Sequence, residues 1–107
     1  MTEFEKAIYI SHRFQGKDSN AEDTERIIKL LQKDYPSYLF ISPIHTFRFL
    51  YNEVDYNTGL NMCLWLLERC DECWVIGDNW ESSIGVKIEI EYCKDHRIPH
   101  KIVGDVK

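Results

Sequence analysis

The stretch ECWVIGDNWESSIGVKIEIEYC, residues 72–93, decides the fold, because it combines a buried strand with the helix that follows it. Its first part, residues 72–78, is a short apolar run that contains a glycine, which is typical of a buried strand. Two serines and a glycine then lead into a run with glutamates at positions 89 and 91. Placed at about 100° per residue, this run has a broad apolar arc and a charged arc. It therefore predicts a helix that begins near Ser82 or Ser83.

Three further apolar runs, at residues 6–11, 38–43 and 98–104, predict the other strands of a sheet. Helical patterns over residues 21–35 and 60–70 separate them. Strand and helix thus alternate along the chain, which specifies a parallel sheet with helices on both faces. We expect the 107 residues to form a single α/β domain. It should be a three-layer sandwich with a four-stranded parallel sheet in the flavodoxin-like order 2-1-3-4.

The pattern also predicts the ends and the surroundings of the helices. Asn20 or Ser19 is expected to cap the helix over residues 21–35. Residues 44–59 have no regular period, and we expect a long loop of the kind that forms binding loops or lids. The helix over residues 60–70 is nearly all apolar, so we expect it to be buried on most sides.

Composition excludes several classes of function. The net charge of −5 and the scattered lysines and arginines argue against binding to a nucleic acid polymer. No apolar run approaches the roughly 20 residues that a membrane span needs. The acidic start MTEFEKAIYIS is unlike a signal peptide. We therefore expect a cytoplasmic protein with no membrane partner, and nothing in the sequence calls for a cofactor.

Four cysteines stand at positions 63, 70, 73 and 93. Cys70-x2-Cys73 followed by Cys93-x2-His96 superficially has the spacing of a zinc ribbon. However, Cys73 opens an apolar strand rather than a knuckle turn. We expect no metal site and four reduced, mostly buried thiols.

Glu89 falls near the middle of the apolar arc of the helix, one turn after Gly85 and one turn before Cys93. Burying a carboxylate there is costly unless it is paired, hydrogen-bonded or functional. A structural role, with hydrogen bonds from a neighbouring strand or loop or a place in a subunit interface, and a functional role both stay open on this pattern alone. Glu91 lies among lysines, as a solvated surface residue should.

The residues at the start of this helix favour a functional role. The helix begins at the carboxyl edge of the sheet, where such folds bind ligands. The Ser83 hydroxyl and the free amides of the first turn are suited to a phosphate. Gly85 removes a side chain where a ligand would approach the backbone. A phosphate at the cap and a sugar carbon near Glu89 would lie about 5–6 Å apart along the axis, which suits a nucleotide.

Ser83-x-Gly85-x3-Glu89, after the strand CDECWVIG, resembles the signature of the nucleoside 2-deoxyribosyltransferase-like superfamily. That superfamily includes 2′-deoxynucleoside 5′-monophosphate N-glycosidases and many short phage and bacterial proteins. The segment YISHRFQG, which ends at Gly16, is similar to the opening strand and glycine-containing loop of the family. The resemblance covers about residues 7–103.

The resemblance implies an enzyme that hydrolyses or transfers the N-glycosidic bond of a nucleoside or nucleotide, with the chemistry of a retaining glycosidase. It implies that Glu89 is the nucleophile and that Ser83 binds the 5′-phosphate. Gly85 and Gly16 are expected to complete the phosphate-binding set. The expected substrate-binding residues are Tyr9, Ser11, His12, Arg13, His45 and Phe47.

Two departures from the family pattern concern catalysis. The family usually carries an aspartate eight residues before Asp71, and this position is Cys63 here. The first loop has His12 and Arg13 where small residues or proline are common, and this pair either recruits phosphate or narrows the pocket. Loss of the aspartate favours a non-catalytic module that holds a nucleotide or a nucleotide-derived signal in the same pocket. Asp55 and Asn57 are the candidates to replace the missing acid.

Two choices remain open from the sequence. The aromatic residues Phe47, Phe49, Tyr51 and Tyr56 either stack on a base or pack in the core. His45 either faces the site or is a structural histidine.

The helix over residues 60–70 has more apolar surface than one small domain readily covers, and related family members form homo-oligomers. We therefore expect a homodimer or larger assembly that buries Trp65 or Leu66 through a symmetric contact.

Overall fold

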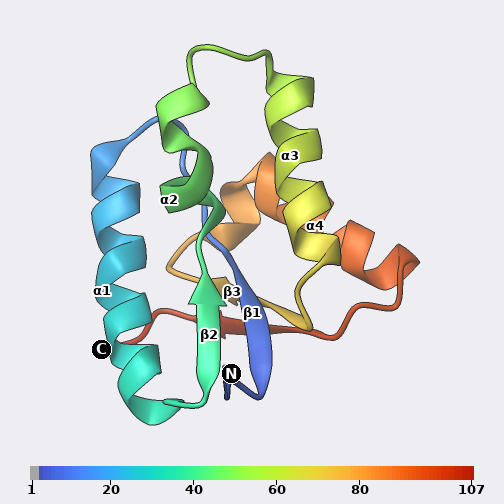
Figure 1. The fold of residues 1–107 in the computed structure, drawn as a ribbon. Helices are drawn as coiled ribbons and strands as arrows, with labels where there is room; N and C mark the ends of the chain where they lie inside the picture. The colour runs from blue at the N-terminus through green and yellow to red at the C-terminus, as the bar shows by residue number, and fades with distance from the viewer. Residues whose placement is uncertain (1–2) are drawn as a thin grey trace.

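A computed structural model describes residues 3–107 and shows one sheet of four strands (Figure 1). All neighbouring strands are parallel, and their order is β2-β1-β3-β4. This confirms the predicted α/β fold and its strand order. The strands are β1 (Lys6–Ser11), β2 (Tyr38–Ile41), β3 (Glu72–Ile76) and β4 (His100–Gly104).

Helices cover both faces of the sheet, as a chain of parallel crossovers requires. The long helix α1 lies on one face, and α3 and α4 lie on the other (Figure 1). None of the helices within residues 3–107 combines the length and the apolar character that crossing a membrane would demand. The α-helices are α1 (Asp18–Asp34), α2 (Pro43–Phe47), α3 (Tyr56–Glu68) and α4 (Ile84–Asp95), and the short 3-10 helices are η1 (Arg48–Leu50) and η2 (Trp80–Ser82).

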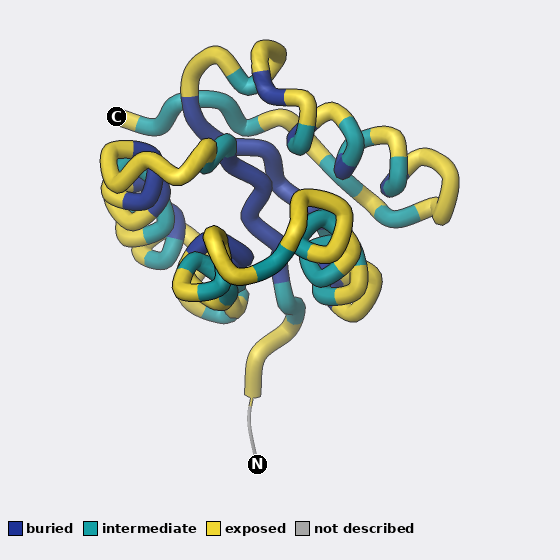
Figure 2. The backbone as a smooth tube through the Cα atoms, turned by 90° about the horizontal axis from the view of Figure 1, so that it is seen from above, coloured by how far each residue is buried: buried dark blue, intermediate teal, exposed yellow. Residues whose placement is uncertain are grey.

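The core has two halves because successive strand residues point to opposite faces. Toward α1, Ile8 and Ile10 of β1 and Trp74 of β3 pack against Ile27 and Leu31. Figure 2 shows the central strands buried and the outer sides of the helices exposed. The other half, toward α3 and α4, is built from Tyr9, Leu67, Cys70, Cys73 and Cys93.

The four cysteines are free thiols. Cys70, Cys73 and Cys93 are buried and Cys63 is half-buried, so the prediction of mostly buried thiols is confirmed.

The start of α1 differs from the prediction of an Asn20 or Ser19 cap. The helix begins at Asp18, and the capping position is Lys17, whose side chain makes no capping hydrogen bond. Asn20 lies inside the first turn, and its Nδ2 donates to the backbone oxygen of Phe14 at 2.7 Å. The side chain is therefore used to hold the preceding loop rather than the helix end.

The segment predicted as a long loop, residues 44–59, is largely helical. Ser42 caps α2, where its Oγ accepts from the backbone nitrogen of His45 at 3.3 Å, and Pro43 occupies the first turn. Asp55 caps α3 by accepting from the backbone nitrogen of Thr58 at 2.7 Å. The first cap starts α2, a helix that the search for hydrophobic periodicity did not find, and the second starts α3 at Tyr56, four residues before the predicted position 60.

The prediction that the apolar helix over residues 60–70 is buried on most sides is wrong. Within α3 only Leu67 is buried, and Trp65 is 57% exposed. One face of the helix packs on the sheet, and the remaining apolar side chains stay partly in contact with solvent. The apolar surface of α3 therefore exceeds what this single chain covers.

Candidate functional site

A cavity of about 660 Å³ lies beyond the carboxyl ends of the strands. The loop after β1, the α2–η1 segment, the first turns of α3 and the start of α4 form its walls. This is where open parallel sheets place their ligand sites. Of the predicted site residues, six line the cavity: Glu89, Ser83, Gly85, His12, Arg13 and Phe47.

Glu89 is a buried carboxylate on the cavity wall, 7% exposed. It lies on the inner face of α4 together with the buried residues Val86 and Cys93. Its Oε1 accepts from the Ser11 Oγ at 2.7 Å, and its Oε2 accepts from the Tyr9 hydroxyl. Tyr9 and Ser11 point to this face because they alternate with Ile8 and Ile10 along β1. Both predicted residues therefore act on Glu89 instead of lining the cavity themselves.

Burial raises the pKa of Glu89 to about 7, although the hydrogen bonds from Tyr9 and Ser11 favour the charged form and lower it. Burial, and then the charge of Glu89, raise the pKa of Tyr9 well above its usual value. The phenol hence keeps its proton and remains a donor to the carboxylate. Such an arrangement holds the carboxylate in one orientation and leaves it able to change its charge near neutral pH.

Ser83 caps α4 at the edge of the cavity. Its Oγ accepts from the backbone nitrogen of Val86 at 3.3 Å, and this leaves the hydroxyl hydrogen free to donate. The amides of Ile84 and Gly85 belong to the first turn and have no acceptor within the helix. A Cβ added at Gly85 would meet only the Ser83 Oγ, at 3.9 Å. Protein packing therefore does not require a glycine here, and the space in front of its backbone belongs to the cavity.

Arg13 and His12, adjacent in the loop after β1, have different surroundings. The Nε of Arg13 is buried and has no hydrogen-bond partner among the described residues. By contrast, the His12 ring lies between the Asp23 carboxylate, 2.8 Å from Nε2, and the backbone oxygen of Arg13, 2.6 Å from Nδ1. His12 holds the loop, and the Arg13 guanidinium is the cation that a ligand in the cavity can use.

Besides Tyr9 and Ser11, two more of the predicted residues do not line the cavity. His45 is engaged on both ring nitrogens, with the Ser42 Oγ at 2.8 Å from Nδ1 and Glu25 at 2.9 Å from Nε2. Gly16 has a φ of +69°, and a Cβ there would come within 2.7 Å of the Tyr51 ring. His45 thus connects α2 to α1 through Glu25, and Gly16 leaves room for the Tyr51 ring.

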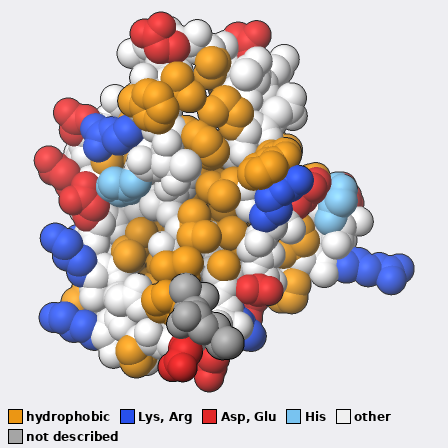
Figure 3. Space-filling view, viewed as in Figure 1, with side chains coloured by type: hydrophobic (Ala, Val, Ile, Leu, Met, Phe, Trp, Pro, Cys, Tyr) orange, Lys and Arg blue, Asp and Glu red, His pale blue; other side chains and the backbone are white. Residues whose placement is uncertain are grey.

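Aromatic side chains gather at the mouth of the cavity. Phe47, Tyr51 and Tyr56 line it, whereas Phe49 does not and is 74% exposed. Phe14 meets Tyr51 edge to face at 5.1 Å between ring centroids, which joins the first loop to the segment above it. Figure 3 shows hydrophobic side chains gathered over this end of the molecule. Three of the four aromatic residues therefore line the cavity, where a ligand could contact them.

The position of the missing aspartate is on the cavity wall. Burial, and then the charge of Glu89, raise the pKa of Cys63 to about 11, so its thiol stays neutral at physiological pH. Asp55 also lines the cavity, but the hydrogen bonds from Thr58 lower its pKa. Asn57 does not line it. Neither Cys63 nor Asp55 is tuned to donate a proton near pH 7.

Sequence reasoning missed Gln15, Arg48 and Leu50 in the cavity wall. Gln15 and Gly16 both have a positive φ, which turns the first loop back toward the cavity. Arg48 pairs with Asp18 and lies over the Phe14 ring, 5.7 Å from its centroid. The Ser42–Pro43 pair, which caps the short helix α2, was the available signal that residues 43–50 form a structured wall.

Comparison with known proteins gives a family over nearly the whole chain. The model of a family described as Domain of unknown function (DUF7768) matches residues 6–103. The chain belongs to the DUF7768 family. The matched region of this DUF7768 domain begins at β1 and ends in β4, so it includes the sheet and every segment that lines the cavity. No curated protein and no solved structure matches the chain.

Proposed function

We propose that this protein cleaves or transfers the N-glycosidic bond of a nucleoside or nucleotide, with Glu89 as the nucleophile. The buried carboxylate of Glu89, held by two hydroxyls on the wall of a ligand-sized cavity, is the observation that carries this proposal. Pockets of a few hundred Å³ with a few convergent polar groups are typical of small-molecule sites. The resemblance of Ser83-x-Gly85-x3-Glu89 to the deoxyribosyltransferase-like signature supplies the reaction class.

The chemistry divides into two displacements. In the first, a Glu89 oxygen attacks the anomeric carbon, the bond to the base nitrogen breaks, and the base leaves with the electron pair and takes a proton from water. In the second, water or another base attacks the same carbon and the Glu89 carboxylate is released. Ser11 and Tyr9 orient the carboxylate for both steps.

A phosphate on the sugar has a matching environment at the start of α4. The Ser83 hydroxyl and the first-turn amides offer donors, and Arg13 offers a positive charge that forms no ion pair with any other of residues 3–107. We expect monophosphates to bind better than the corresponding nucleosides. Charge-assisted hydrogen bonds of this type contribute about 1.5–3 kcal/mol each.

The test of catalysis is a panel of deoxynucleosides and their monophosphates, assayed for free base. Release should occur with the natural sequence and disappear in Glu89→Ala. Glu22→Ala, at an exposed position on α1, is the matched control and should retain it. Base release that persists in Glu89→Ala would remove the nucleophile from the proposal.

The phosphate contact is tested separately by affinity. Ser83→Gly removes the hydroxyl and keeps an acceptable helix cap, so the protein should fold while its preference for monophosphates falls. Arg13→Met should reduce the same preference and leave nucleoside affinity unchanged. Equal affinities of the natural protein for both ligand types would remove the phosphate site.

A second candidate is a module that binds a nucleotide or nucleotide-derived signal without turning it over. The neutral thiol of Cys63 and the ionised Asp55 favour it, because neither protonates a leaving base efficiently. Tight binding of a monophosphate, with no base released by the natural protein, would select this candidate. Cys63→Asp is then the informative variant, since it restores the carboxylate of the resembling family.

A further inference from the structure

The large cavity contains two carboxylates without a cationic partner in the described part of the protein. Glu89 and Asp55 both line it, and neither forms an ion pair with any other of residues 3–107. Glu89 is buried, and the Tyr9 and Ser11 hydroxyls that donate to it carry no charge. A negative charge inside a protein is stabilised by a positive charge nearby. A positively charged group on a ligand would supply it here.

The basic residues of the cavity leave Arg13 for a negatively charged group. The His12 ring lies against Asp23. Arg48 pairs with Asp18, whereas Arg13 forms no ion pair with any other of residues 3–107. Together with the first-turn amides of α4, Arg13 suits the phosphate of a nucleotide. The cavity thus offers unpaired charges of both signs, which complement a nucleotide that also carries a positive charge.

The aromatic wall of the cavity indicates that this positive charge belongs to the base. The rings of Phe47, Tyr51 and Tyr56 line the cavity. The faces of such rings attract cations and stack on flat heterocycles. A heterocyclic base that carries a positive charge makes use of both interactions.

None of the described residues that line the cavity is suited to protonate a leaving base. Apart from Glu89, the carboxyl group on its wall is that of Asp55, which accepts from the Thr58 backbone nitrogen at 2.7 Å. The hydrogen bonds from Thr58 lower the pKa of Asp55, so this group is ionised at neutral pH. Both ring nitrogens of His12 are engaged, with the Asp23 carboxylate and a backbone oxygen. The remaining acidic protons belong to thiols and phenols, which are weak acids.

A base joined to the sugar through a positively charged ring nitrogen does not need this proton. When its bond to the anomeric carbon breaks, the electron pair neutralises the ring and the base leaves as a neutral molecule. An ordinary base leaves as an anion unless an acid protonates it, and such an acid contributes about 10²–10⁴-fold to the rate. The groups that line the cavity therefore favour the first kind of base.

We infer that the substrates of this site are nucleotides whose base is joined to the sugar through a positively charged ring nitrogen, as in pyridinium and N7-alkylated purine nucleotides. This substrate class presupposes the proposed role of Glu89 as the nucleophile. A Glu89 oxygen bonds to the anomeric carbon as the neutral base leaves. Water then attacks this carbon, the Glu89 carboxylate is released, and one proton passes to the solvent.

A positively charged base also increases the ionised fraction of Glu89. Burial raises the pKa of this carboxyl to about 7, so the free protein holds both its charged and its neutral form near neutral pH. A positive charge next to a carboxyl favours the charged form, and this form is the nucleophile. Binding of such a base hence activates the group that attacks its sugar.

The test compares guanosine monophosphate with its 7-methyl derivative, in which one methyl group gives the ring a positive charge. Both are assayed for released base, as ribo- and deoxyribonucleotides, beside nicotinamide mononucleotide as the pyridinium probe. After subtraction of spontaneous release, a positively charged nucleotide should lose its base at least about 100-fold faster than guanosine monophosphate. The faster of the two charged probes identifies a pyridinium or a purine, and its cleavage should disappear in Glu89→Ala.

The outcomes separate this substrate class from the proposed reaction itself. Release of guanine from the unmethylated nucleotide, at a rate within about tenfold of the charged ones, keeps the glycosidase and overturns the substrate class. No base release from any of these nucleotides overturns both.

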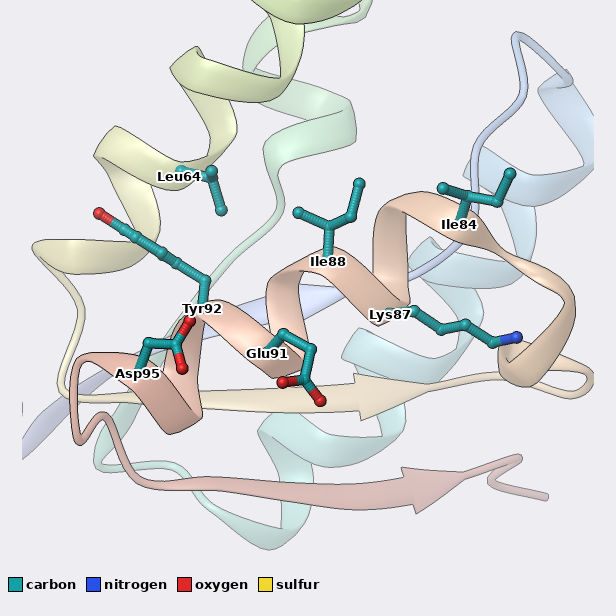
Figure 4. A pocket seen from close by; sticks show the side chains of 7 residues that line it. All are labelled: Leu64, Ile84, Lys87, Ile88, Glu91, Tyr92 and Asp95. Carbon is teal, nitrogen blue, oxygen red and sulfur yellow. The ribbon is translucent and has the colours of Figure 1, made fainter.

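Recognition of the charge is tested with Asp55→Asn, because asparagine also caps a helix well and the protein should fold. The KM for the 7-methyl nucleotide should rise about fivefold, while the inhibition constant of the unmethylated nucleotide stays unchanged. The matched control is Glu91→Gln, since Glu91 is a carboxylate of α4 that borders a separate groove with Tyr92 and Asp95 (Figure 4). It should change neither constant. An equal effect of Asp55→Asn on both ligands would show that the cavity does not recognise the positive charge, and this overturns the substrate class.

Discussion

Replacing Glu89 by glutamine should make the protein more stable above neutral pH. The carboxyl has a pKa of about 7 in the folded protein against an ordinary value of 4.5, with burial as the main cause. The folded state therefore binds this proton more tightly than the unfolded state does. The stabilising effect is complete below about pH 4.5 and is lost as the pH rises through about 7.

The size of the effect follows from the interval between the two pKa values. Each pH unit corresponds to about 1.4 kcal/mol, so the natural protein should lose about 3 kcal/mol from Glu89 alone between roughly pH 4.5 and pH 8. Glutamine resembles the protonated acid, because it offers one acceptor oxygen and an N–H donor to Tyr9 and Ser11. It never becomes charged, so the variant lacks this loss.

The assay is urea unfolding at about pH 5 and about pH 8 for both proteins. The difference in unfolding free energy, variant minus natural, should grow by about 2–3 kcal/mol between the two pH values. Titration of the other groups changes the unfolding free energy of both proteins equally, so it cancels in this difference. Glu22→Gln, on the exposed side of α1, should show no such growth. Equal pH dependence for Glu89→Gln and the natural protein would refute the reasoning that burial governs this carboxyl.

Three further predictions concern Tyr9, Gly85, and Gly77 in comparison with Gly104. Tyr9→Phe removes a hydrogen bond that lowers the pKa of Glu89, so the acidic limb of a pH–activity profile should move to higher pH; an unmoved limb would contradict the assigned contact. Gly85→Ala should fold with equal or higher melting temperature, because alanine favours helices by about 0.5–1 kcal/mol, and yet bind monophosphates more weakly in calorimetry. Gly77→Ala should destabilise by about 2–3 kcal/mol in chemical unfolding, since the φ is +88° and a Cβ would lie 2.7 Å from a buried imidazole. Gly104→Ala, with a φ of +74° and no atom within 4 Å, should cost clearly less, and equal losses would show that the contact is unimportant.

The strands and α4 were predictable because each carries its own local signal. Residues 6–11 form an uninterrupted strand run, and Ser83 is a recognisable cap that places Glu89 on the inner face of α4. Alternation along β1 shows only that Tyr9 and Ser11 share one face of the sheet. That Tyr9 meets Glu89 could not be predicted, because positions 9 and 89 come together only in the tertiary structure. Predicting burial for α3 failed because hydrophobicity does not reveal whether the covering surface belongs to the same chain.

The walls of the cavity were harder to predict, for a different reason. The first loop and α2 are held by single hydrogen bonds and by close approaches of rings to glycines. Such contacts depend on a few atoms and leave no periodic pattern. His45 shows this clearly, because its position after Pro43 suggests a site residue, whereas its ring is occupied by Ser42 and Glu25.

The segment that follows β4 is connected to the cavity by a chain of ionic contacts. Asp105 pairs with Arg26 at 2.7 Å, Arg26 pairs with Asp23 at 2.8 Å, and Asp23 holds the His12 ring beside the carbonyl of Arg13. A purification tag or fusion partner attached directly after this segment would disturb the first contact, and its effect would reach the loop that carries the free guanidinium. A tag before β1 joins the chain ahead of a central strand, and none of these contacts involves a residue that precedes β1. The placement of the tag therefore decides whether binding measurements report on the natural loop.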